Sequence, residues 1–413
     1  MAYLYLYILF IETELHMENP IKTYERIRSI DVFRAITILL MVFVNDVAGV
    51  RNIPGWLKHA EPGSPGMTFV DVVFPAFLFI VGLALPFAFA RREKHEPGKA
   101  LWGHILTRTA SLLAIGLLML NGAAVTSMSP AWWNVIMYLG VILFWADASF
   151  LSNKPKISGI LKISGALLLV LMLVLFRRDS TSGNTWIQTG WWGILGEIGF
   201  AYLISSLLYL LFREKPLLLF SVPFFCLLLY IADRSGQLDF LGRVKDIFFI
   251  GSHFGTHVLI AFSGLLCGYF LFRGEGQEKR QILTKMGLFA LLLLLAGYAL
   301  YGLYGIDKIA ATPSWALYSS AVCVLLFMLI YWIMDIKGFV FFYDFFKPLA
   351  VNSLLAYILH VMFIYVFRLI GIAAFYGSGL GSGGIGILRS LLYTGFIYLI
   401  TRLLTWAGLR LRL

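Results

Sequence analysis

The residues that could do chemistry gather near the start of an otherwise apolar chain. One apolar segment ends at Asn45 and Asp46, the next begins at Asp71, and His59 stands in the short connection between them. An imidazole with an unperturbed pKa of about 6.5 suits a general base at neutral pH, and a neighbouring carboxylate can orient its ring. We therefore expect these four side chains to meet on one membrane face. Taken singly, each also fits a solvated loop or an ordinary helix end.

A second ionisable group, Arg28, Asp31 and Arg34, lies at the opposite end of the first apolar segment. Asp31 and Arg34 can pair on one helix face. The arginines could bind phosphate groups, and the cluster is equally typical of a topological signal or a helix cap. Arg108 and Asn352 fall inside later apolar segments, where polar side chains are costly and are therefore functional candidates.

Two histidines, His253 and His257, have the i,i+4 spacing that can place two metal ligands on one helix face. No Asp or Glu completes the pattern locally, so we predict no metal site. Glu197 belongs to the other polar residues within apolar segments. The three cysteines show no metal-ligand spacing.

The elements that must position these residues are membrane-spanning helices. Of the 413 residues, 60% are hydrophobic and 13% charged, whereas soluble domains carry about 25% charged residues. The sequence predicts an all-α, polytopic transmembrane helical bundle of about twelve helices, with a range of 10–12. The expected spans are 32–50, 68–90, 101–121, 131–149, 157–176, 191–212, 217–232, 253–273, 286–304, 314–334, 347–368 and 386–408.

The distribution of Lys and Arg predicts the topology. The richer set of basic loops is expected in the cytoplasm, which makes both termini cytoplasmic and the loops 51–67, 177–190, 233–252 and 305–313 non-cytoplasmic. We interpret the net charge of +11 as a topological signal and not as a sign of nucleic-acid binding. Residues 1–25 are expected to form an N-terminal cytoplasmic or interfacial segment, and 26–413 a single transmembrane domain.

Four stretches carry a family resemblance. They read RIRSIDVFRAITILLMVFVNDVAG, WLKHA, GMTFVDVVFPAFLFIVGLALP and TRTASLLAIGLLMLNG, between Arg26 and about Asn121. They resemble the bacterial relatives of heparan-alpha-glucosaminide N-acetyltransferase, a family of transmembrane acyltransferases, and weaker similarity continues through 349–360.

The resemblance implies an enzyme of a bacterial inner membrane that takes acetyl groups from acetyl-CoA on the cytoplasmic side. The acceptor would be an amino sugar or glycan on the other side. His59 matches the family's active-site histidine, and Asn45 matches the family asparagine at the end of the preceding helix. By our own chemical reasoning, Asp46 or Asp71 would orient the ring. Arg28, Arg34, Arg108 and Asn352 are our candidates for binding the donor. A homodimer is one candidate assembly.

Departures from the family pattern leave the acceptor open. Glu61 follows the Lys-His-Ala stretch, and 195–198 reads Leu-Gly-Glu-Ile where many relatives place Gln-Arg. Two other functions fit the sequence. One is a secondary transporter of a small sugar-like or anionic substrate. The number of helices fits a transporter, but the sequence shows no paired repeat halves. The other is a non-catalytic partner in glycan processing.

Overall fold

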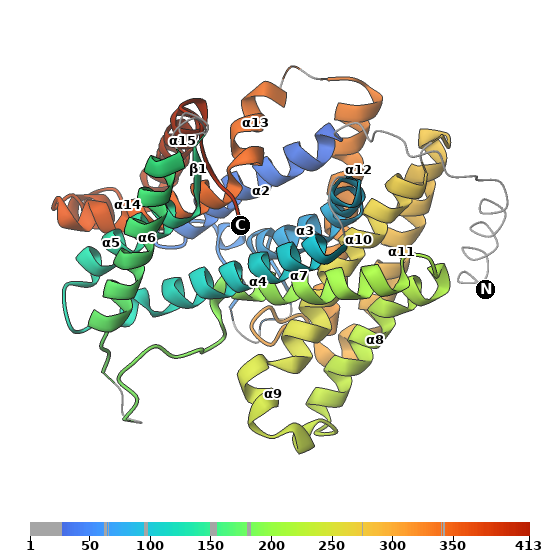
Figure 1. Ribbon diagram of the computed structural model, residues 1–413. Coiled ribbons are helices and arrows are strands. Elements are labelled where there is room, and N and C mark those ends of the chain that lie inside the picture. The colour runs from blue at the N-terminus through green and yellow to red at the C-terminus, as the bar shows by residue number, and fades with distance from the viewer. Residues whose placement is uncertain are drawn as a thin grey trace.

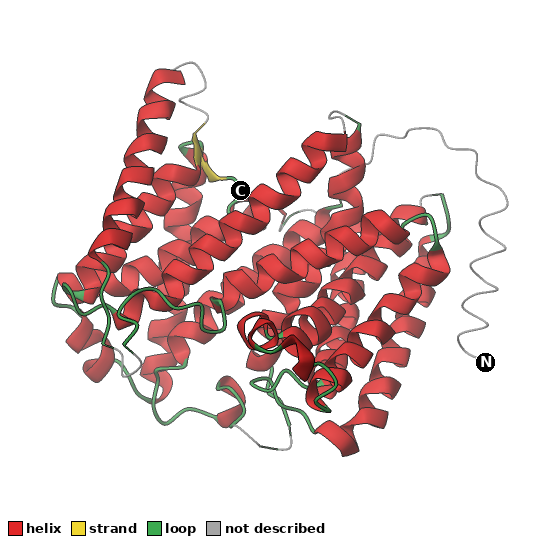
Figure 2. Cartoon of the chain, turned by 60° about the horizontal axis from the view of Figure 1, so that its bottom comes forward, coloured by secondary structure: helices red, strands yellow, loops and turns green. Residues whose placement is uncertain are grey.

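The computed structural model describes residues 27–413 apart from 62–63, 65, 95–97, 149–154, 180–182, 275, 340 and 342. The predicted segment 1–25 lies outside these residues. The described chain is helical apart from loops and one short antiparallel pair of strands, in which Ala146 faces Leu411 (Figure 2). The helices and strands are α2 (Arg28–Val47), α3 (Val70–Glu93), α4 (Gly98–Asn121), α5 (Pro130–Trp145), β1 (Ala146–Ala148), α6 (Pro155–Leu175), α7 (Gly193–Phe212), α8 (Pro216–Arg234), α9 (Arg243–Phe248), α10 (Val258–Arg273), α11 (Lys279–Tyr304), α12 (Pro313–Tyr331), α13 (Tyr343–Val351), α14 (Ser353–Leu369), α15 (Gly383–Trp406) and β2 (Leu409–Leu411).

The bundle character of the fold is confirmed. Nine helices within the described ranges are long and apolar enough to cross a membrane, or ten if the bent pair α13–α14 counts as one span. Eleven of the twelve expected segments each coincide with one helical segment of the structure, and the twelfth, 347–368, coincides with two. However, α2 carries several charged residues, and α5 has only 16 residues, fewer than the roughly 20 that a span needs. The count of about twelve spans is therefore not confirmed.

The expected span 347–368 is broken. Its two halves, α13 and α14, meet at an angle of 75°. Asn352 stands at the break with a backbone conformation outside the helical region. Its side-chain amide donates to Thr405 Oγ1 at 2.7 Å and to the Leu409 carbonyl at 2.8 Å, and its oxygen accepts from the Leu411 amide. The kink is thus stabilised by the C-terminal segment.

The helix α10 is buried almost throughout and packs along α3 in the middle of the bundle (Figure 1). Three glycines allow the two backbones to approach closely. A Cβ at Gly82 would stand 1.6 Å from the Ala261 carbonyl oxygen, and one at Gly264 would stand 1.9 Å from the Phe79 oxygen. Gly268 meets Leu83 in the same way. Small residues at such a contact are the usual means by which helices associate in a membrane.

The helix α2 connects to α3 through the loop that contains His59. At the start of α2, the carboxylate of Asp335 accepts hydrogen bonds from the backbone amides of Arg28 and Ser29. These amides have no partner within the helix, so the distant carboxylate caps it. The end of α2 and the start of α3 then lie together at the opposite end of the bundle, where the chemistry is expected.

Candidate active site

His59 and Asp71 are in direct contact. The Nδ1 atom of His59 lies 2.7 Å from Oδ1 of Asp71. The side chain of His59 is 42% exposed, whereas that of Asp71 is 2% exposed. The structure therefore combines a buried, fixed carboxylate with a histidine whose ring is still accessible. A carboxylate in this position can hold an imidazole in one orientation and one tautomer.

Asp71 is fixed by the ends of two segments. Its Oδ2 atom accepts hydrogen bonds from the backbone amides of Ala60 and Thr68 at 3.1 and 3.0 Å. The Thr68 hydroxyl donates to the Lys58 carbonyl at 2.7 Å, which closes the loop onto α3. From α12, the indole of Trp315 donates to the backbone carbonyl of Asp71. The loop beside His59 and the first turn of α3 thus form one hydrogen-bonded unit.

His59 lines a cavity of about 440 Å³. Its wall comes from α2, α3, α7, η5 (Gly251–His257) and α12 and from the loops beside them. Three of the four loops that the sequence assigns to the non-cytoplasmic side contribute, and Trp191 directly follows the fourth. The polar residues in the wall are Asn45, His59, Glu197, Ser252, His253, His257 and Lys308.

Lys308 joins this site from the loop between α11 and α12. Its Nζ atom lies 3.2 Å from Nδ1 of His59. The loop is shaped by Asp307, whose carboxylate accepts from the amides of Ile309 and Ala310. Burial lowers the pKa of the Lys308 amine below its ordinary value, although the charges of Asp71 and Glu197 oppose the shift. Sequence reasoning treated Lys308 only as a loop charge, and no local signal distinguishes it.

Asp46 contacts a different group of residues. Its carboxylate accepts from the hydroxyls of Tyr376 and Ser390, each at 2.6 Å, and from Nη2 of Arg389 at 3.0 Å. The partners belong to η7 (Phe375–Gly379) and α15. Of the two carboxylates that could orient His59, it is therefore Asp71 that touches the ring. Asp46 ties the end of α2 to α15, and Asn45 beside it lines the cavity.

Of the residues expected at the donor side, Arg28 and Arg34 lie in one cluster, because Tyr343, which underlies Arg28, donates its hydroxyl to Asp31, the partner of Arg34. Arg108 and Asn352 contact other residues. The pairing of Arg34 with Asp31 is confirmed at 3.5 Å. The Arg28 guanidinium lies over the Tyr343 ring and that of Arg108 over the Tyr202 ring. The Nε atom of Arg108 is buried and has no hydrogen-bond partner among the described residues. Asn352 is engaged with the C-terminal segment, as described above.

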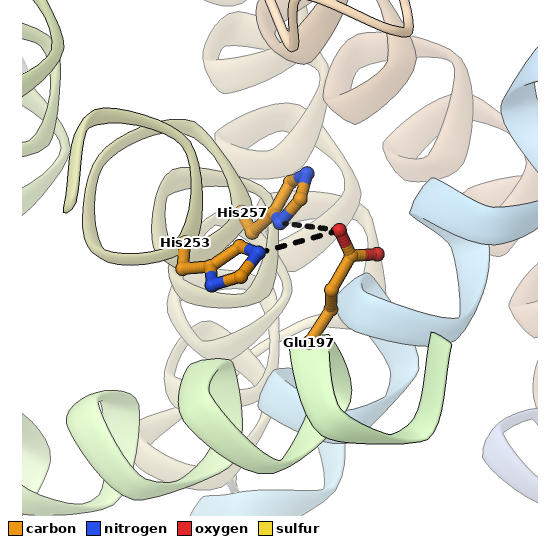
Figure 3. A group of neighbouring side chains, drawn as sticks. All are labelled: Glu197, His253 and His257. Atoms are coloured by element: carbon orange, nitrogen blue, oxygen red, sulfur yellow. Dashed lines mark ion pairs between the residues drawn. The ribbon is translucent and has the colours of Figure 1, made fainter. Parts of the chain in front are cut away.

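Three further titratable residues meet in the cavity wall. His253 and His257 lie on η5, and Glu197 reaches them from α7 (Figure 3). The carboxylate that the sequence lacked near the two histidines is thus supplied by another helix. The presence of Glu197 within an apolar segment was a signal, but nothing in the sequence connects it with residues more than fifty positions away.

The comparisons with known proteins agree with the resemblance noted in the sequence. A family model described as "Domain of unknown function (DUF5009)" matches residues 26–239. The chain is 34% identical over 118 residues to heparan-alpha-glucosaminide N-acetyltransferase from Homo sapiens, and 31% identical over 118 residues to the protein of that name from Mus musculus. Each alignment covers 28% of this chain and only 17% of the relative.

Proposed function

The chain belongs to the DUF5009 family, and from that premise we propose that it is a membrane-embedded acetyltransferase. It transfers an acetyl group from cytoplasmic acetyl-CoA to an amino sugar or glycan on the non-cytoplasmic side, with His59 as general base or acetyl carrier. One observation carries the proposal. The imidazole of His59 is held by the buried carboxylate of Asp71 at the wall of a cavity large enough for part of a substrate. The similarity to an N-acetyltransferase supports the reaction class.

In the proposed mechanism, Nε2 is the reacting nitrogen of His59, and the contacts of Nδ1 support this assignment. In a neutral ring, Nδ1 can either donate to Asp71 or accept from Lys308, but not both. The 2.7 Å contact with Asp71 is shorter than the 3.2 Å contact with Lys308 and favours a proton on Nδ1. The lone pair is then on Nε2, which can accept a proton from an acceptor amine or hydroxyl.

The transfer step needs a base and a stabilised oxyanion. As the acceptor nitrogen or oxygen attacks the thioester carbon, its proton passes to Nε2 of His59, and Asp71 stabilises the resulting imidazolium. The carbon–sulfur bond then breaks, and the imidazolium gives this proton to the departing sulfur, which leaves as the CoA thiol. Asn45, which lines the same cavity, serves as a donor to the thioester oxygen, where charge develops. In the two-step form, His59 itself takes the acetyl group before the acceptor arrives.

The donor approaches from the opposite face in this proposal. The phosphates of acetyl-CoA remain in the cytoplasm near Arg28, Arg34 and Arg108, because charged groups do not enter hydrocarbon, while the thin pantetheine arm reaches inward. Asn352 supports donor binding indirectly, because it fixes the kink between α13 and α14. Residues 26–413 act as one transmembrane domain of about twelve spans with both termini in the cytoplasm of a bacterium, in its inner membrane, as a monomer or homodimer.

The test uses purified protein in liposomes with isotopically labelled acetyl-CoA and a panel of amino sugars. Wild-type protein is compared with His59→Gln, and with His104→Gln as a matched histidine control on α4, outside the cavity wall. Mass spectrometry identifies labelled products. We expect labelled N-acetyl sugar from the wild type and His104→Gln, and at least a roughly 100-fold lower rate from His59→Gln.

Two outcomes would change the proposal. Transfer at the wild-type rate by His59→Gln would remove the assigned role of this histidine. No transfer to any acceptor, together with a substrate-dependent proton or sodium flux in vesicles, would replace the enzyme with a transporter. Rapid quenching without acceptor separates the two chemical routes, because only the two-step route accumulates acetyl-histidine.

A further inference from the structure

We propose that Glu197, His253 and His257 form a binding site for a divalent transition-metal ion, zinc in the first instance. The two histidines are 1% and 4% exposed, and the Glu197 side chain is 12% exposed. Figure 3 shows both imidazole rings directed at the same carboxylate oxygen of Glu197. Two imidazoles and one carboxylate are a recurrent set of protein ligands in catalytic zinc sites.

The distances fit a shared ion better than direct hydrogen bonds. Oε1 of Glu197 lies 3.4 Å from Nε2 of His253 and 3.8 Å from Nδ1 of His257. All three ligand atoms lie within 4.8 Å of one another. A hydrogen bond between nitrogen and oxygen has its donor and acceptor about 2.7–3.2 Å apart. A tetrahedral ion with bonds of about 2.1 Å separates its ligands by about 3.4 Å.

Two ring nitrogens of this cluster, Nδ1 of His253 and Nδ1 of His257, are buried without a hydrogen-bond partner among the described residues. Nδ1 of His257 is buried, faces Glu197 and has no hydrogen-bond partner among the residues that the structure describes. A buried polar atom without a partner costs about 1–3 kcal/mol. An ion between the three side chains would satisfy this nitrogen and the Glu197 carboxylate together.

One continuous helical segment carries the two histidines. They lie on η5, a π-helical turn that continues directly into the buried helix α10. Such π-helical turns are frequently found at functional sites. Gly255 between the two histidines lets this turn pack on α8, where an added Cβ would stand 3.1 Å from the Cys226 carbonyl. Phe200 stacks on the His253 ring, with the two ring centroids 5.5 Å apart.

The cluster opens onto the cavity that His59 lines. With three protein ligands, a tetrahedral ion keeps one position for water or for an oxygen of a bound molecule. Two residues connect the cluster with His59. Trp315 donates to the Asp71 carbonyl and lies edge-on to the His257 ring, with the ring centroids 6.0 Å apart. Nζ of Lys308 lies 3.2 Å from Nδ1 of His59, and Lys308 lines the same cavity as Glu197. The metal would therefore present its open position to a molecule bound beside His59.

The test measures metal content and needs no acetyl transfer, so its outcome is independent of the proposed function. The protein is purified through a histidine-free tag, stripped with a chelator, reloaded with zinc and analysed by inductively coupled plasma mass spectrometry. The variants are Glu197→Gln, His253→Asn and His257→Asn. His104→Gln and His59→Gln are matched histidine controls, because neither belongs to the cluster.

We expect one zinc ion per chain in the wild type and both controls. Loss of a residue that only hydrogen-bonds to a metal ligand weakens metal binding by roughly 10–100-fold. Loss of one of the three ligands themselves should weaken zinc binding by at least this factor. Equal zinc content in the wild type and all three cluster variants would overturn the proposal.

A second measurement on the wild type alone covers the case in which the variants do not fold. Cobalt replaces zinc in such sites, and a tetrahedral cobalt ion absorbs visible light strongly. Titration of metal-free protein with cobalt should give this spectrum with an end point at one equivalent, reversed by zinc. A spectrum no different from cobalt in buffer would contradict the site.

Discussion

Nδ1 of His59 and Oδ1 of Asp71 are 2.7 Å apart, in a pair that joins an accessible imidazole to a carboxylate with almost no exposure. The difference in exposure separates their roles. Asp71 is held by two backbone amides and cannot reach a substrate easily, whereas His59 faces the cavity. We therefore propose that the carboxylate acts through the histidine, as a positioning residue.

Asp71→Asn should lower kcat by roughly 10²–10⁴-fold with little change in KM for either substrate. The amide can still accept from Ala60 and Thr68, so the loop keeps its shape. It no longer fixes the tautomer of His59 or stabilises the imidazolium. Steady-state kinetics with both substrates gives the two constants. Asp147→Asn is the matched control, since that carboxylate forms an exposed 2.7 Å ion pair with Arg412. A normal kcat in Asp71→Asn would show that the contact between His59 and Asp71 does not support the reaction.

The contact between His59 and Asp71 could be predicted from the sequence, because one residue lies in a short loop and the other lies at the start of the helix that follows it. The same local logic located the helical segments, since apolar length is a property of contiguous residues. The kink at Asn352 was not predictable, because the amide is bound by the C-terminal residues Leu409 and Leu411. A contiguous apolar run gives no sign of such distant partners.

The part of the site that sequence reasoning missed is assembled from three distant segments. Lys308, Glu197 and His253 meet only when α7, η5 and the loop before α12 pack around one cavity. Their polarity within or beside apolar segments marked some of them as candidates. Their mutual proximity is a property of helix packing, which spacing along the chain does not encode.

Lys308→Arg should move the alkaline limb of the pH–rate profile to higher pH. The pKa of Lys308 is lowered chiefly by burial, so its ammonium loses its proton at a pH below the ordinary lysine value. If the positive charge beside His59 and Asp71 supports the reaction, activity is present below that pKa and lost as pH rises through it. A guanidinium stays charged over this range.

The measurement is kcat/KM against pH for the wild type, Lys308→Arg and Lys308→Met. Lys308→Met should be slower at neutral pH and should lack this limb, because it has no charge to lose. An alkaline limb at the same pH in all three proteins would show that another group titrates there.

Arg389→Met should destabilise the fold strongly. The ion pair of Arg389 with Asp46 joins side chains that are only 7% and 4% exposed. Removal of one partner leaves a buried charge uncompensated and costs about 3–5 kcal/mol. The matched control is Arg412→Met, whose partner Asp147 and own side chain are largely exposed, and the expected cost there is about 0–1 kcal/mol. Thermal unfolding in detergent, followed by tryptophan fluorescence, compares the two. Equal midpoints would mean that the buried pair contributes no more than a surface pair.

Gly82→Ala should also destabilise the protein, because α3 and α10 touch through backbone atoms at this point. An added Cβ would stand 1.6 Å from the Ala261 carbonyl oxygen and 2.9 Å from the Leu265 amide nitrogen, and a backbone cannot rotate away as a side chain can. Overpacking of this kind costs about 1–3 kcal/mol or more. Gly395→Ala on α15 is the control, because a Cβ there meets no atom within 4 Å. It should leave stability unchanged or raise it by up to about 1 kcal/mol through helix propensity.

Since α3 carries Asp71 at its start, Gly82→Ala should in addition lower kcat in the fraction that remains folded. Thermal midpoints and kinetics on the same preparations test both effects, and a Gly82→Ala protein as stable as Gly395→Ala would show that the two helices can separate without cost.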